Sequence, residues 1–283
     1  MVISVQVTLT SAESKVLLAK AAVQMPQVCK ALTDARVLLI GGTTVSALSE
    51  ELGFCPLRIS GRINASGCRT ALNIMDSPHN LLIENGQGQN ADKNIQNIVV
   101  SLGRQDLIIV GANAMDTQGR AAMAFAAVGG GSRGFALHSG FLQGVPFIIL
   151  CGINKLVLDL TSTIANCGRR TVKYSMGAAI GLYPLYGPII TEIKAFEFLF
   201  GVDAVVIAAD GIDGGEGSRT FILKGEEEVV KKAWKLVMSI KGAQISCDKG
   251  SLPACTGACA HCQRHIGCIY KTEKLREPLG KQA

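Results

Sequence analysis

A group of closely spaced cysteines near the end of the chain offers the clearest chemistry in the sequence. Half of the ten cysteines fall within 22 of the 283 positions, and His261 and His265 lie among them; the five are Cys247, Cys255, Cys259, Cys262 and Cys268. Thiols at such spacings either form disulfides or ligate a metal ion. The rest of the chain has the pattern of an intracellular α/β protein, and reducing conditions inside the cell favour a metal site.

Two kinds of metal site fit this spacing. An iron–sulfur cluster takes thiolate ligands, and C-x3-C-x2-C followed by a fourth cysteine suits a [4Fe-4S] cluster. Zinc is the alternative, because Cys259 and Cys262 form one C-x2-C pair with His265 close behind. Disulfides or free thiols are the third interpretation. We predict four ligands, with Cys247 as a reserve: Cys255, Cys259, Cys262 and Cys268.

A glycine turn early in the chain has the pattern of an anion-binding loop. The apolar run Arg36–Ile40 predicts a strand, and the spacing of Val45, Leu48 and Leu52 predicts a helix. Gly41, Gly42, Thr43 and Thr44 connect the two. Glycines let a ligand approach the backbone, and the amides and dipole of a helix N-terminus favour negative charge. The turn therefore predicts a site for a phosphate or carboxylate.

Three segments together resemble a known superfamily. They are IGGTTVSAL from Ile40, DLIIVGANAMD from Asp106 to Asp116, and VGGG from Val128, the last followed by the strand 145–150 and by KLV from Lys155. Their order and spacing over residues 14–158 resemble ribose-5-phosphate isomerase, the DeoR-type sugar-phosphate sensors and the CoA-transferases. The resemblance implies a Rossmann-like core that binds a phosphorylated sugar or an acyl compound of the CoA type. It implies ligand contacts from Asn113, Asp116, Gly129, Gly130, Gly131 and Lys155, in addition to residues 41–44.

The sequence departs from the isomerase where that enzyme carries its acids. Asn113 stands where the isomerase has an aspartate, and residues 135–139 contain His138 but no carboxylate to act as the base. The candidate catalytic residues are therefore Asp116, Glu84 and Cys68. Glu84 begins an ENG triplet that is similar to the one in class I CoA-transferases, and Cys68 lies near two arginines that favour a thiolate.

The order of expected elements predicts an α/β protein in three parts. Strands alternating with helices over residues 1–173 predict a Rossmann-like, ligand-binding parallel sheet flanked by helices. Residues 174–245 read as βαββα and predict a small ferredoxin-like α+β domain that serves as a lid or an interface. Residues 246–283 form the Cys-rich metal-binding segment. An apolar share of 48% with 18% charged residues supports a folded chain throughout most of this length.

Composition and charge limit the partners. Half of the net charge of +6 comes from residues 246–283. Aromatic residues are scarce at 5% and no helix-turn-helix pattern is evident, so nucleic acid is not an expected partner. Residues 1–10 lack the basic and apolar regions of a signal peptide, and the long uncharged stretch 174–191 contains two prolines and three glycines. We predict a cytoplasmic protein without membrane spans, capable of forming a homo-oligomer.

Three hypotheses follow for function. The first is an enzyme of the isomerase or transferase type that acts on a phosphorylated or acyl substrate. The second is a non-catalytic sensor that binds a metabolite and reports metal or redox state. The third places catalysis at the cluster itself, with one coordination position of an iron left open.

Overall fold

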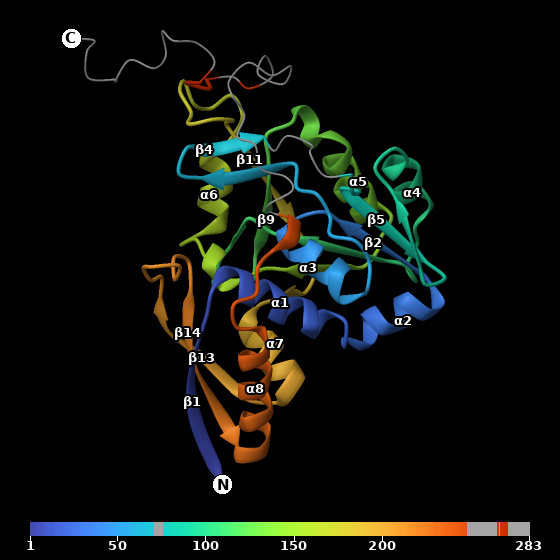
Figure 1. Ribbon diagram of the computed structural model, residues 1–283. Coiled ribbons are helices and arrows are strands. Elements are labelled where there is room, and N and C mark those ends of the chain that lie inside the picture. Colours follow the sequence, from blue (N-terminus) through green and yellow to red (C-terminus); the bar gives the residue numbers. More distant parts are fainter. Residues whose placement is uncertain (71–75, 248–264, 266, 271–283) are drawn as a thin grey trace, which may run out of the picture.

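The computed structural model describes residues 1–70, 76–247, 265 and 267–270. Its main element is a six-stranded sheet with the order β12-β10-β7-β2-β5-β6 (Figure 1). These strands are Ile189–Ile190 (β12), Phe147–Leu150 (β10), Leu107–Gly111 (β7), Arg36–Ile40 (β2), Asn80–Glu84 (β5) and Gln87–Asn90 (β6). Strands β12, β10, β7 and β2 are parallel, whereas β5 pairs antiparallel with both β2 and β6. The predicted α/β class is confirmed, and the sheet is mixed rather than wholly parallel.

Both faces of this sheet are buried. Along β2, Val37 and Leu39 point to one apolar cluster and Leu38 and Ile40 to another, as the period of two in a strand requires. The first cluster contains residues of the three helices Ser11–Ala22 (α1), Pro26–Asp34 (α2) and Thr43–Glu51 (α3). The second contains residues of Ile95–Ser101 (α4) and Gly131–Leu142 (α5). Helices therefore cover both faces and hold the strand ends in a fixed position.

A second sheet joins the first strand of the chain to two strands that lie about 200 positions later. Its order is β1-β14-β13, with Val2–Leu9 (β1), Arg219–Glu226 (β14) and Asp203–Ala209 (β13) all antiparallel. Glu192–Phe200 (α7) and Glu227–Ile240 (α8) contribute to its apolar cluster. The βαββα order occurs along residues 189–240, but β12 joins the six-stranded sheet and the distant β1 takes its place here. Elements from the ranges 1–173 and 174–245 thus share both sheets.

Short strands lie beyond one end of the main sheet. Gly181–Leu185 (β11), Ala121–Phe125 (β9) and Ala114–Met115 (β8) form a three-stranded sheet, and Gly61–Asn64 (β3) pairs with Gly67–Thr70 (β4) in a hairpin. Leu160–Asn166 (α6) contacts β11. The short described segment 267–270 lies at the top of Figure 1, where Cys268 forms a bridge with Ser175. None of the helices in the described ranges has the length and apolar character needed to cross a bilayer.

Candidate functional site

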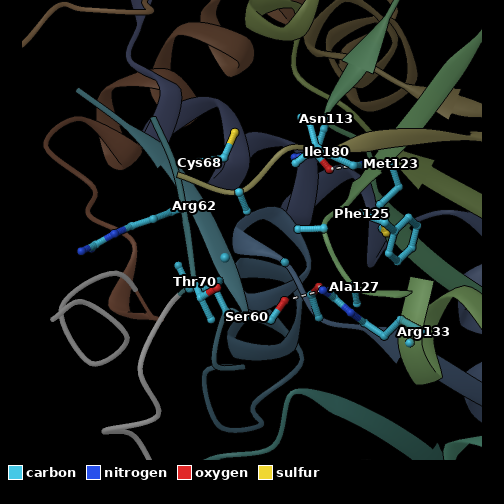
Figure 2. A pocket seen from close by; sticks show the side chains of 18 of the residues that line it. Ser60, Arg62, Cys68, Thr70, Asn113, Met123, Phe125, Ala127, Arg133 and Ile180 are labelled. Carbon is cyan, nitrogen blue, oxygen red and sulfur yellow. Dashed lines mark hydrogen bonds between the residues drawn. The ribbon is translucent and has the colours of Figure 1, made fainter. Parts of the chain in front are cut away.

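A cavity of about 580 Å³ opens at the carboxyl ends of the parallel strands. Residues that follow β2, β7 and β10 line it, which is where open α/β sheets commonly bind ligands. The hairpin β3–β4 and residues 123–128 form its other walls. Figure 2 shows Ser60 and Arg133 joined by a hydrogen bond on one side of the cavity, with Asn113 and Ile180 on the other.

Helix α3 brings its N-terminus to this cavity. Gly42 is the N-cap residue, and no side chain accepts a hydrogen bond from the first turn. The preceding Gly41 is required by space, because a Cβ atom there would lie 1.8 Å from the backbone oxygen of His79. The Gly41 amide donates to the side chain of Asn80 at 3.3 Å, so it holds the turn rather than facing a ligand. Thr43 and Thr44, the first two residues of α3, line the cavity. The partial positive charge of the helix N-terminus is therefore located at these two residues.

Helix α5 brings a second N-terminus to the same cavity. Its N-cap residue is Gly130, again without a side-chain cap. Gly129, Gly130 and Gly131 have φ angles of 60°, 74° and 64°, a left-handed conformation that side chains other than hydrogen rarely adopt. Gly130, Gly131 and Ser132 line the cavity. The three glycines therefore bend the chain so that the first residues of α5 line the same cavity as the first residues of α3.

The charged side chains at the cavity are all basic in the described part of the chain. Arg62, Arg69, Arg133 and Lys155 line it, and no described aspartate or glutamate does. Arg133 donates to the Gly41 oxygen at 2.9 Å and to the Ser60 hydroxyl. Burial lowers the pKa of Arg133 to about 10, and the guanidinium still carries its charge at neutral pH. The electrostatic potential here favours an anion.

Lys155 and His79 also line the cavity, and the two side chains differ in their contacts and in their basicity. The Lys155 ammonium donates to the Ala112 oxygen at 2.6 Å, which places it at the end of β7. His79 is buried, and burial together with the charge of Arg133 lowers its pKa to about 3. Its Nδ1 lies 2.5 Å from the Arg58 oxygen, and Asp92 accepts from its backbone amide. His79 is therefore a neutral, positioned side chain and a weak base.

Most of the predicted ligand residues lie together at this cavity. Eight of them line it: Gly41, Gly42, Thr43, Thr44, Asn113, Gly130, Gly131 and Lys155. Gly129 shapes the turn but is not among the described lining residues, and neither is Asp116 or Glu84, which ends β5. Cys68 does line the cavity, but burial raises its pKa and keeps the thiol protonated. The two arginines on β3 and β4 thus do not make it a thiolate.

Asp116 is fully engaged within the protein. Its carboxylate accepts hydrogen bonds from the amides of Gln118, Arg120 and Leu160, and it forms an ion pair with the Arg120 side chain. Burial opposes its ionisation, but these hydrogen bonds outweigh burial and lower the pKa of Asp116 to about 2. The same guanidinium bonds Asp159, which caps α6. The described contacts therefore give Asp116 a structural role and leave no proton to exchange near neutral pH.

Three of the four predicted metal ligands, Cys255, Cys259 and Cys262, lie outside the described residues. The fourth, Cys268, is buried, and Cys247 is fully buried in the apolar cluster that contains α1 to α3. Within the described ranges, no three His, Cys, Asp or Glu side chains are grouped so that they could hold a metal ion. The [4Fe-4S] or zinc site stays a prediction.

Sequence reasoning missed several residues of the cavity wall. Arg133 donates to Ser60 and to Gly41, which are 73 and 92 positions away, and no local pattern marks Arg133, Ser60 or His79. His265 was considered only as a metal ligand, yet it lines the cavity. A turn signal, Asn64 to Gly67 between β-type residues, could have revealed the β3–β4 hairpin.

Searches against protein-family models, curated proteins and solved structures found no match for this chain. The resemblance to the sugar-phosphate isomerase and CoA-transferase superfamily therefore stays a prediction.

Proposed function

We propose that this protein binds a small anionic metabolite, a phosphorylated sugar or an acyl compound of the CoA type, in the cavity between α3 and α5. One observation carries the proposal. Two uncapped helix N-termini meet at one cavity whose described charged lining residues are four bases and no acid. Amides at helix starts and guanidinium groups are the donors that proteins use for phosphate and carboxylate groups.

The size and character of the cavity support the same ligand class. A volume of about 580 Å³ lies within the range of roughly 300–1,000 Å³ typical of sites for small molecules. Apolar side chains such as Met123, Phe125 and Ile180 share the wall with the basic groups. An anionic head with a less polar body fits this division, as in a sugar phosphate or an acyl thioester.

The described residues support binding more directly than turnover. Isomerase or transferase chemistry needs a base or a nucleophile at the ligand. Burial raises the pKa of Cys68, so its thiol is not a thiolate nucleophile near neutral pH, and His79, with a pKa of about 3, is neutral but a weak base. This observation favours the second candidate, a metabolite sensor. Turnover of aldose phosphates and acyl-CoA esters by anaerobically purified full-length protein separates an enzyme, including one whose catalytic centre is the cluster, from a sensor.

The metal site is a separate proposal. We infer a cluster or zinc ion held by the cysteines of residues 246–283, of which Cys268 is buried beside the cavity wall. Iron and sulfide content with broad visible absorbance supports [4Fe-4S], whereas colourless protein with stoichiometric zinc supports the alternative. Protein with neither metal after anaerobic purification contradicts both.

A thermal-shift series tests the proposed ligand class. Ribose 5-phosphate is compared with ribose, inorganic phosphate with chloride at equal ionic strength, and acetyl-CoA with pantetheine. A ligand that binds only the folded state raises the free energy of unfolding by about 2.7 kcal/mol at 100 times its dissociation constant. We expect stabilisation by at least one of ribose 5-phosphate, inorganic phosphate and acetyl-CoA, and by none of ribose, chloride and pantetheine. Equal responses within every pair contradict the proposal.

A further inference from the structure

The C-terminal residues that the structure describes lie against the wall of the cavity. We propose that Tyr270 is a positioning residue that holds Arg69 and the β3–β4 hairpin at the cavity, so that segment 267–270 forms part of the ligand site. The inference rests on the proposed function of the cavity. It adds to that function a dependence of ligand affinity on the cysteine-rich end of the chain.

Tyr270 contacts the hairpin at two points. Its ring lies under the Arg69 guanidinium, with 4.3 Å from the guanidinium carbon to the ring centre. Its hydroxyl donates to the backbone oxygen of Ser66 at 3.0 Å, in the turn between β3 and β4. A cation over an aromatic ring is attracted by the negative face of that ring. Tyr270 therefore fixes both the hairpin turn and a basic side chain that lines the cavity.

Backbone hydrogen bonds anchor the segment that carries Tyr270. The Ser175 amide donates to the Gly267 oxygen at 2.8 Å, and the Ile269 amide donates to the Ser175 oxygen at 3.1 Å. Gly267 has a φ of 76°, and a Cβ atom there would lie 2.8 Å from the Lys173 oxygen. Cys268, between the two bonded positions, is buried. The segment is thus paired with the chain at Ser175 as a short parallel bridge.

The same stretch of chain continues to the cavity wall. The Cys68 amide donates to the Met176 oxygen at 2.9 Å, and the Ala178 amide donates to the Cys68 oxygen at 2.7 Å. Cys68 and Ala178 both line the cavity. Hydrogen bonds therefore run without interruption from segment 267–270 through residues 175–178 to β4.

His265, just before segment 267–270, itself lines the cavity. Its Nε2 lies 3.2 Å from the Thr70 hydroxyl, and both residues line the cavity. A ligand held by α3 and α5 therefore faces a wall built partly from the C-terminal segment. Because coupling between two sites is reciprocal, an anion in the cavity must also stabilise the docked segment.

Replacement of Tyr270 tests the positioning role, with inorganic phosphate as the probe and its dissociation constant measured by calorimetry. Tyr270→Leu removes the ring beneath Arg69, and we expect affinity to fall at least fivefold. Tyr270→Phe keeps the ring and loses only the hydroxyl, so it should restore most of the affinity. Tyr186→Leu, at an exposed tyrosine that does not line the cavity, is the matched control and should bind as the unmodified chain does.

Hydrogen exchange supplies the reciprocal measurement and does not need a variant. Phosphate at saturation should slow exchange in the peptides that contain the Ser175 and Ile269 amides. Unchanged exchange there, or equal phosphate affinity in the Leu and Phe variants, overturns the inference while phosphate binding itself still supports the proposed function. Absence of phosphate binding to the unmodified chain overturns the proposed function instead. If Tyr270→Leu fails to fold, the exchange experiment and the Phe variant decide.

Discussion

Two loops at the ends of the central strands differ in how their charges are balanced. At Asp116, one carboxylate accepts from three backbone amides and pairs with Arg120, so every described donor has its acceptor. At the cavity, the starts of α3 and α5 and four basic side chains are among the lining residues, and no described carboxylate is. Comparison of the two teaches that a loop with balanced charge builds the fold, whereas an excess of basic over acidic groups around a cavity favours an anionic ligand.

The largest effect on ligand affinity is expected from a variant that fixes a negative charge at the cavity. Thr43→Asp places a carboxylate at the first residue of α3. Two unit charges at 4 Å interact by about 4 kcal/mol at an effective dielectric constant of 20, so phosphate affinity should fall more than about 100-fold. The same charge should stabilise the free protein by about 0.3–1 kcal/mol through the helix dipole. Calorimetry and thermal unfolding measure the two opposite changes.

Gln27→Asp is the matched control for this variant. Gln27 is exposed at the start of α2, another helix without a side-chain cap, and it does not line the cavity. We expect the same gain in stability with no loss of phosphate affinity. Retention of phosphate binding by Thr43→Asp would remove α3 from the site.

Asp116→Asn should affect stability and leave ligand affinity unchanged. Loss of the charged acceptor weakens several buried hydrogen bonds, and we expect a cost of about 1–3 kcal/mol in the free energy of unfolding at neutral pH. The folded-state pKa of Asp116 is lowered, so its contribution is complete above the ordinary value of 3.8 and is lost as pH falls through about 2. Urea unfolding of both proteins between pH 2 and 7 should show the difference shrinking toward acid. A reduced affinity for phosphate would return Asp116 to the binding site.

Removal of one basic side chain should have an intermediate effect. Lys155→Met keeps the apolar stem and deletes the charge at the end of β7. We expect phosphate affinity to fall about tenfold, which corresponds to about 1.4 kcal/mol. Lys194→Met, at an exposed lysine of α7 that pairs with Glu197, is the control. Equal affinities in the two variants would mean that Lys155 serves only to bond the Ala112 oxygen.

The smallest effect is expected at Glu84. Glu84 ends β5, pairs across the sheet with Arg36 and does not line the cavity in the described part of the chain. Glu84→Gln should therefore change neither phosphate affinity nor any turnover of acyl-CoA esters. Loss of transferase activity in this variant, with binding intact, would restore the covalent role that the ENG triplet suggested.

Local sequence patterns predicted those strands, turns and helices whose formation depends on neighbouring residues. The apolar run Arg36–Ile40, the glycines after it and the helical spacing beyond were sufficient to place β2, the turn and α3. The strand β10 and the helix α8, which ends the βαββα order, followed from the same kind of signal. The glycine turns of the proposed anion site were predictable to this extent, because turns between strands and helices carry a conformational requirement that the sequence records.

Contacts between distant positions could not be predicted in this way. Val2–Leu9 alternates in burial as a strand should, but nothing near it identifies β14, with which it pairs more than 200 positions away. Arg133 and His79 reach the cavity only through the packing of α5 and β5 against residues 41–60. The sequence also does not show that Asp116 would be neutralised by Arg120 and by amides as far as Leu160.

Amide chemical shifts during a phosphate titration test the central claim most directly. In the ¹⁵N-labelled full chain, the amides of Thr43, Thr44, Gly131 and Ser132 should shift in a saturable way with one common dissociation constant. The capped starts of α1 and α7, held by Thr10 with Glu13 and by Thr191, should not respond. Saturable shifts confined to the starts of α3 and α5 are the predicted result. Shifts that are absent there, or that rise linearly and equally at all helix starts, would contradict the account.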